Sequence, residues 1–316
     1  EQEQPDGTIK TVTETETVTI ADIDYVAQVL EENGLFEYKF VFKIFSALTK
    51  AKYDLTPGTF ELNTDMDYRA LISSMGRGSS SRKTTTVTLT EGMTVEQIFQ
   101  KLSDAGVSTV DKLNDTAANY DFKYSFLKGV VPLGEPNRLE GYLFPDTYQF
   151  FENDTVESIL DRFLNNFENK LTDEMRDDIA KSGYTTDQII TLASIIQAEA
   201  ANTDDMYMIS AILRNRLENG AEHDIHTLDC DSTVYYPYKT ANDAPEGFVS
   251  SYSTYDNSGL PAGPICNPGL EAIKAAIYPS EEGSEYYFFC HDSDGTPYYA
   301  STMDEHLMNM AEAGLL

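Results

Sequence analysis

The residue best suited to catalysis by its type and position is Glu199, which ends the apolar segment TLASIIQAE. Leu192, Ile195 and Ile196 lie seven, four and three positions before it, so its carboxyl projects from the apolar side of a helix. Burial disfavours the ionised carboxylate and raises its pKa, as a general acid requires. The same spacing also fits a surface carboxylate at a helix end, because the apolar pattern stops soon after Glu199.

A second segment, RLEGYLFPDTY at 138–148, carries groups that suit a sugar ligand. It places the carboxylates of Glu140 and Asp146 beside the rings of Tyr142 and Tyr148. Aromatic faces stack on sugar CH groups and carboxylates bond sugar hydroxyls. Such an aromatic run is nevertheless more typical of a buried strand.

A third segment, LPAGPICNPG at 260–269, contains three prolines and two glycines, which predicts a rigid irregular loop. Loops of this kind either present functional groups or serve as plain connections. The preceding residues 251–255, SYSTY, add hydroxyl groups and two aromatic rings.

Other chemistries find no support in the sequence. There is no G-x-S-x-G elbow, no phosphate-binding glycine loop and no H-E-x-x-H motif. His223 and His226 lack a third ligand pattern, and the three cysteines are too few and too widely spaced for a zinc site or a disulfide framework. We therefore expect no metal and no cofactor.

The net charge is −31, from 22 basic and 53 acidic residues, and it argues against nucleic acid and anionic lipid as partners. Acidity of this kind keeps a secreted protein soluble. No apolar run reaches the roughly 18 residues of a membrane span. The chain begins EQEQPDGTIK without Met, which suggests a processed or trimmed fragment whose signal or anchor has been removed.

Periodicity predicts the elements that position these groups, and they indicate an α+β fold. Residues 1–17 are expected to form a linker, and 76–83 a flexible connection that marks the best internal boundary. The helix that carries Glu199 should be capped by Thr185 or Thr186. Further helices are expected at 22–30, 40–51, 66–75, 94–102, 155–171 and 303–315, and strands at 84–90, 286–291 and 298–300.

The three segments, in this order, resemble the MltG (YceG-like) family of endolytic murein transglycosylases. The resemblance is close over about 130–316 and looser over 20–110, where PGTF at 57–60 fits a LysM-like unit. It implies a LysM-like α/β module at 18–83 and a mixed α/β catalytic domain at 84–316. The matching segments are LEGYLFPDTY at 139–148, LASIIQAEA at 192–200, RNRL at 214–217, DSTV at 231–234, YSTY at 252–255, GLPAGPICNPG at 259–269, YFF at 287–289 and EH at 305–306.

The family implies a lytic transglycosylase that cleaves the MurNAc-β-1,4-GlcNAc bond and leaves a 1,6-anhydro-MurNAc end. Its catalytic Glu falls on Glu199, which acts first as acid and then as base. The resemblance also implies peptidoglycan strands as substrate, cell-wall synthesis and division proteins as partners, and a single-pass membrane anchor ahead of an extracytoplasmic catalytic domain. The alternatives are a non-catalytic peptidoglycan-binding scaffold and a muramidase-type hydrolase, which would usually need a second carboxylate.

Positions that match the family supply the expected substrate contacts. Gln197 stands where members often have Glu, and Asp229 where many have Gln, whereas Asp231 is retained. His306 either orients a carboxylate or is structural. Sugar or peptide contacts are expected from Tyr142, Tyr148, Tyr252 and Tyr255, the cleft shape from Gly263, Ile265 and Asn267, bonds to the N-acetyl group or the C6 oxygen from Ser232 and Thr233, and further substrate contacts from Glu140, Asp146, Gln197, Asp231, Thr254 and His306.

Overall fold

The computed structural model divides the chain into two compact units, Glu1–Lys83 and Thr84–Leu316, each with its own hydrophobic core. No helix among the described residues has both the length and the apolar character that a membrane crossing needs. The structure describes residues 22–36, 38–53, 55, 60, 62–64, 66–76, 84–151, 154–238, 240 and 242–316, together with the backbone of 2–3 and 9–10.

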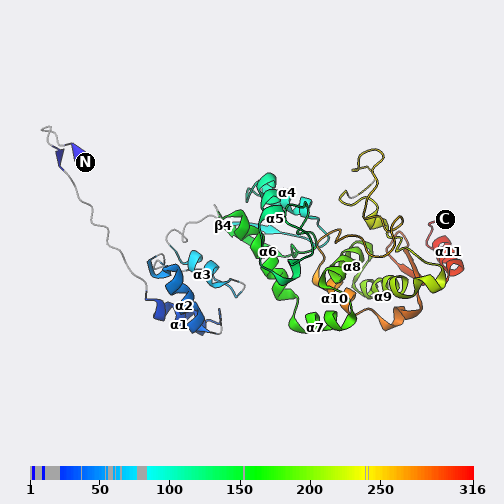
Figure 1. Ribbon diagram of the computed structural model, residues 1–316, viewed down its shortest axis with the longest axis horizontal. Coiled ribbons are helices and arrows are strands. Elements are labelled where there is room, and N and C mark those ends of the chain that lie inside the picture. The colour runs from blue at the N-terminus through cyan, green and yellow to red at the C-terminus, as the bar shows by residue number, and fades with distance from the viewer. Residues whose placement is uncertain are drawn as a thin grey trace. The chain divides into compact units, whose positions relative to one another are not determined.

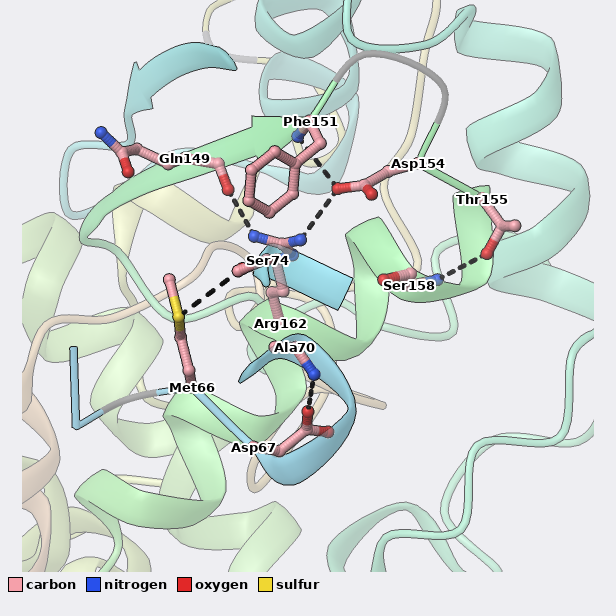
Figure 2. Close-up of polar contacts among 10 residues, drawn as sticks. All are labelled: Met66, Asp67, Ala70, Ser74, Gln149, Phe151, Asp154, Thr155, Ser158 and Arg162. Carbon is pink, nitrogen blue, oxygen red and sulfur yellow. Dashed lines mark hydrogen bonds and ion pairs between the residues drawn. The ribbon is translucent and has the colours of Figure 1, made fainter. Parts of the chain in front are cut away.

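The first unit is a small helical assembly. Asp22 caps the first helix by accepting hydrogen bonds from the amides of Asp24 and Tyr25, and Asp67 caps the third by accepting from Ala70 (Figure 2). The residues Pro57-Gly58-Thr59 of the predicted LysM-like motif lie outside the described residues. The elements are β1 (Gln2–Glu3) paired with β2 (Ile9–Lys10), α1 (Ile23–Glu32), α2 (Lys39–Thr49), η1 (Ala51–Tyr53) and α3 (Tyr68–Ser74), with an isolated bridge between Leu55 and Gly76.

The second unit begins with a two-stranded sheet that brings distant segments together. Strand β3 (Thr84–Thr88) pairs antiparallel with β4 (Thr147–Phe151), so that Thr84 faces Phe151 and Thr88 faces Thr147. Arg162 fixes this sheet to α6 (Val156–Lys170), because its guanidinium donates to the carbonyl of Gln149 and to Asp154 (Figure 2). Along the chain, the segment that connects β3 to β4 contains α4 (Val95–Asp104), α5 (Val110–Asn119) and η3 (Ser125–Leu127).

Helix α8 (Thr186–Glu199) is the central element of the unit. Its residues Ile189–Ile196 are all buried, and a helix that is apolar on every side belongs inside a core. In Figure 1 it lies beside α9 (Thr203–Asn219) and α10 (Leu270–Ile277), both of which pack against it. Helix α7 (Asp173–Ser182) leads into it, and η4 (Gly220–His223) follows α9.

The C-terminal part closes the unit with a hairpin and a helix. Strand β5 (Phe288–His291) pairs antiparallel with β6 (Pro297–Ala300), and α11 (Met303–Glu312) packs on both. The expected core strand at 286–291 is thus shorter and only half-buried, because a lone two-stranded sheet leaves much of its surface open. Helices with small antiparallel sheets confirm the mixed α and β class. The remaining short helices are η5 (Asp231–Thr233) and η6 (Glu281–Glu285).

Candidate active site

Glu199 is the last residue of α8, so the helix determines where its carboxyl lies. Thr185 starts the helix with a capping box: its hydroxyl accepts from the amide of Gln188, whose side chain accepts from the amide of Thr185. The buried middle of the helix then fixes its position in the core. The helix ends at the C-cap Ala200, which directs the chain into the turn before α9.

The carboxyl of Glu199 is partly buried, and one of its two oxygens accepts a backbone hydrogen bond. Oε1 accepts a hydrogen bond from the amide of Ser232 at 3.0 Å. Burial raises the pKa of Glu199, hydrogen bonding from Ser232 opposes this, nearby Asp231 raises it further and His291 lowers it. No hydrogen bond from the described residues engages Oε2. The arrangement favours the protonated form of this carboxyl.

The loop around η5 lies against Glu199 and carries several predicted contacts. Asp231 is exposed, and its Oδ1 accepts from the hydroxyl of Tyr255 at 2.7 Å. Thr233 and Thr254 are buried and bond to each other, with Oγ1 atoms 3.0 Å apart. Thr254 also accepts from the amide of Cys230 at 2.9 Å. The two threonines therefore join this loop to the SYSTY segment by hydrogen bonds. Asp231 and Tyr255 are both exposed, so a ligand can contact them.

Glu140 is placed at the centre of a buried frame. It is 4% exposed, and its carboxyl accepts from the amide of Val95, from the Tyr236 hydroxyl at 2.9 Å and from Nδ2 of Asn267 at 2.8 Å. Val95 opens α4, so the carboxyl also meets the positive end of the helix dipole. Both carboxyl oxygens are engaged inside the protein, which leaves neither for a substrate.

The proline-rich loop is held by the frame and by α8. Asn267 is 1% exposed; its Oδ1 accepts from the amide of Leu143 at 2.8 Å, and its Nδ2 donates to the carbonyl of Met93. The amide of Ile265 donates to Ser194 Oγ at 3.0 Å, and that of Gly269 donates to Gln197 Oε1 at 2.9 Å. Contacts of Ile265, Asn267 and Gln197 thus hold the backbone of the loop in place.

Close packing also explains a glycine in the first motif. A Cβ on Gly141, whose φ is +88°, would lie 2.5 Å from Cγ of Pro264 and 2.8 Å from a methyl carbon of Ile190. Only glycine permits both this backbone conformation and this approach. The LEGYLF segment can therefore lie directly on the proline-rich loop and on α8.

The aromatic residues of the first motif belong to the core. Tyr142 is 1% exposed, and its hydroxyl donates to Asp187 at 2.7 Å. Tyr148 is also buried; its hydroxyl donates to the carbonyl of Phe144 and accepts from Asn166. Neither ring has a face that a glycan could reach in this conformation, so the structure assigns them the role of a buried aromatic run.

The remaining predicted residues are scattered. Asp146 is exposed and bonds Asn166 and its neighbour Thr147. Tyr252 is half-buried against the ring of Tyr236, with centroids 4.6 Å apart, and Gly263 lies next to its hydroxyl. His306 stacks on Phe288, and its buried Nδ1 has no hydrogen-bond partner among the described residues. Among the described residues, His306 therefore forms no hydrogen bond to a carboxylate that it could orient.

Three functional candidates were absent from the sequence interpretation. Buried Asp205 accepts from Nε2 of His291 and from the hydroxyl of Tyr299, each at 2.7 Å. It also accepts from the amide of Ala201, two residues after Glu199. Nothing in the sequence near each residue predicts that the three side chains meet, because they come from α9, β5 and β6. Within the described parts of the chain, no group of three or more His, Cys, Asp or Glu could hold a metal ion.

Comparison with known proteins gives consistent matches. The YceG-like family matches residues 18–312. An endolytic murein transglycosylase of Streptococcus pneumoniae is 28% identical over 314 residues, covering 92% of this chain and 56% of the relative. The endolytic murein transglycosylase of Bacillus subtilis is 27% identical over 299 residues, covering 90% of this chain and 80% of the relative. This chain therefore spans little more than half the length of the pneumococcal protein.

The fold is also similar to a solved structure. A crystal structure of a YceG-like protein from Listeria monocytogenes superposes with a TM-score of 0.59 at 26% sequence identity. The match covers 92% of this chain and 98% of the other.

Proposed function

Because the chain belongs to the YceG-like family, we propose that it is an endolytic peptidoglycan lytic transglycosylase with Glu199 as its single catalytic acid and base. The observation that carries the proposal is the position of this carboxyl. It ends a buried helix, burial raises its pKa, and Oε2 has no hydrogen-bond donor among the described residues. A general acid needs a raised pKa and an oxygen that can reach the substrate.

The proposed reaction uses one carboxyl twice. Protonated Glu199 donates its proton to the oxygen that links MurNAc to GlcNAc, as the bond from C1 of MurNAc to that oxygen breaks. The resulting carboxylate takes the proton of the MurNAc C6 hydroxyl, and that oxygen attacks C1. The products are a free GlcNAc 4-hydroxyl and a 1,6-anhydro-MurNAc end, and Glu199 is protonated again. No water is consumed.

The residues that surround Glu199 have distinct parts in this proposal. The amide of Ser232 holds Oε1, which leaves Oε2 to carry the proton. Asp231 and Tyr255, joined by a hydrogen bond, would contact the glycan on the open side. Glu140 and Asn267 would act from a distance, because they hold the proline-rich loop.

Glu199→Gln in the full chain, assayed on purified glycan strands, tests the assignment. The amide keeps the size of the side chain but cannot act as acid, so the cleavage rate should fall by about 10²- to 10⁴-fold. Glu222→Gln, an exposed residue of η4, is the matched control and should retain the parent rate. Parent-like cleavage by Glu199→Gln would refute the assignment, and glycan binding without cleavage by the parent would indicate a scaffold.

A hydrolase is the second candidate, and the position of Asp231 favours it. This exposed carboxylate is close enough to influence the pKa of Glu199 and could activate water. Mass spectrometry separates the two reactions, because the anhydro product is one water lighter than the hydrolysed one. Anhydro ends support the transglycosylase; reducing MurNAc ends, with activity lost in Asp231→Asn, support the hydrolase.

The wider setting is also proposed. Residues 18–83 would form a LysM-like module that binds peptidoglycan, and 84–316 the catalytic domain. A single-pass membrane anchor would hold the protein outside the cytoplasm, near cell-wall synthesis and division proteins. Sedimentation of the Glu199→Gln protein with insoluble peptidoglycan measures binding without cleavage; a protein that stays in the supernatant would contradict the role of the module.

A further inference from the structure

A buried carboxylate joins the turn after Glu199 to the C-terminal hairpin. Asp205 lies in the first turn of α9 and is 1% exposed. Its Oδ2 accepts from the Ala201 amide at 2.8 Å and from His291 Nε2 at 2.7 Å, and its Oδ1 accepts from the Tyr299 hydroxyl at 2.7 Å. Three donated hydrogen bonds compensate the buried carboxylate for its lost water.

The tip of the hairpin lies near the same turn. Gly295, at the tip between β5 and β6, lies so close to Ala201 that an added Cβ would be 3.6 Å from the Ala201 Cβ. His291 is the last residue of β5, and Tyr299 lies in β6. The hairpin therefore approaches the turn after α8 at its tip, and Asp205 joins it to that turn by hydrogen bonds.

Charged and titratable groups reach Glu199 from several elements. Asp231 and Cys230 approach from the η5 loop, Arg216 from α9 and His291 from β5. His291 itself faces Asp205. The imidazole is therefore near the catalytic carboxyl without a hydrogen bond to it. His291 can position Glu199 only indirectly, through Asp205 and the Ala201 amide.

We infer that Asp205, His291 and Tyr299 form a clamp that holds the Glu199 carboxyl opposite the Ser232 amide, with His291 as its positioning residue. The inference rests on the proposed role of Glu199. The clamp fixes the main chain at Ala201, two residues beyond the carboxyl. A displacement of about 1 Å costs on the order of 10²-fold in rate, so the clamp acts on the chemical step and leaves glycan affinity unchanged.

Two substitutions of His291 provide the test. His291→Gln places an amide donor near the position of Nε2, whereas His291→Leu is of similar size and donates nothing. We expect kcat to fall about tenfold in His291→Leu with KM unchanged, and to stay within about twofold of the parent in His291→Gln. Ser293→Ala, on the exposed hairpin turn, is the control and should match the parent. Equal losses in both His291 variants, or a change in KM alone, would overturn the inference.

Hydrogen exchange of the Ala201 amide measures the clamp without catalysis. Exchange should be about tenfold faster in His291→Leu and unchanged in His291→Gln and Ser293→Ala. Parent-like protection in His291→Leu refutes the clamp even if its activity falls. If Glu199→Gln is fully active while Ala201 exchanges as expected, the assignment of Glu199 fails and the cluster has no positioning role.

Discussion

Replacing Glu140 by Gln tests whether its buried carboxyl binds a proton when the chain folds. The carboxyl accepts from the Val95 amide at 3.0 and 3.2 Å, from Tyr236 at 2.9 Å and from Asn267 at 2.8 Å. Near pH 4.5 this carboxyl is protonated in the folded protein, so one of its oxygens already carries a hydrogen, and the amide of Gln likewise offers one donor and one acceptor. We therefore expect Glu140→Gln to change the free energy of unfolding by less than about 1 kcal/mol near pH 4.5.

The effect should depend on pH with a defined sign. Burial raises the pKa of Glu140 from 4.5 to about 8. Between these values the folded protein binds a proton that the unfolded chain has released, so the stability of the parent falls as pH rises, by up to about 1.4 kcal/mol per pH unit. Gln does not titrate and contributes no such slope. The variant should therefore gain stability relative to the parent as the pH rises, and it should be the more stable of the two near pH 8.

Urea unfolding from pH 4.5 to 8, followed by circular dichroism, measures both quantities. Tyrosine fluorescence provides a second probe, because the chain has 20 tyrosines and no tryptophan. Glu96→Gln, exposed in the first turn of α4, is the matched control and should change stability by less than about 0.5 kcal/mol at any pH. Parallel stability curves for the parent and Glu140→Gln would refute the reasoning, because they would mean that Glu140 does not bind a proton on folding.

Two further substitutions separate the frame from the ligand-facing side. Tyr142→Phe removes the hydroxyl that donates to Asp187 at 2.7 Å; it should cost about 1 kcal/mol in urea unfolding and leave cleavage and glycan binding at parent levels, whereas lost glycan binding would contradict the placement of this ring in the core. Ser194→Ala removes the acceptor of the Ile265 amide and the donor to the Thr191 carbonyl, so it should cost about 1–3 kcal/mol and speed exchange of the Ile265 amide; unchanged exchange would show that the loop is held elsewhere.

Local signals in the sequence were sufficient for several helices, although α5, α7, α9 and α10 were not predicted individually. Thr94, Thr155 and Thr185 each cap the helix that the apolar pattern predicts, because capping and periodicity depend on residues within a few positions. Pairing of β3 with β4 joins Thr84 to Phe151, and nothing in either strand alone specifies that partner. The limited burial of β5 was missed for the same reason, since it depends on how few strands the sheet has.

The site was only partly predictable. Helical spacing placed Glu199 on the apolar side of α8, and the raised pKa agrees with that expectation. The contact with Ser232 spans 33 positions, and the contacts of Asp205 with His291 and Tyr299 span 86 and 94. Residues so far apart in the sequence produce no periodic pattern that would pair them. Only the ordered motifs pointed to Ser232, and the Asp205 cluster was not predicted.

Glu140 and Glu199 show why a raised pKa alone does not identify the catalytic acid. Burial raises the pKa of both carboxyls. Both oxygens of Glu140 accept hydrogen bonds inside the frame, so its proton has no path to a ligand. Glu199 has one oxygen held by Ser232, and no described residue donates to the other. An acid must transfer its proton to a substrate, so the oxygen that accepts no hydrogen bond from the described residues, more than the pKa, distinguishes Glu199.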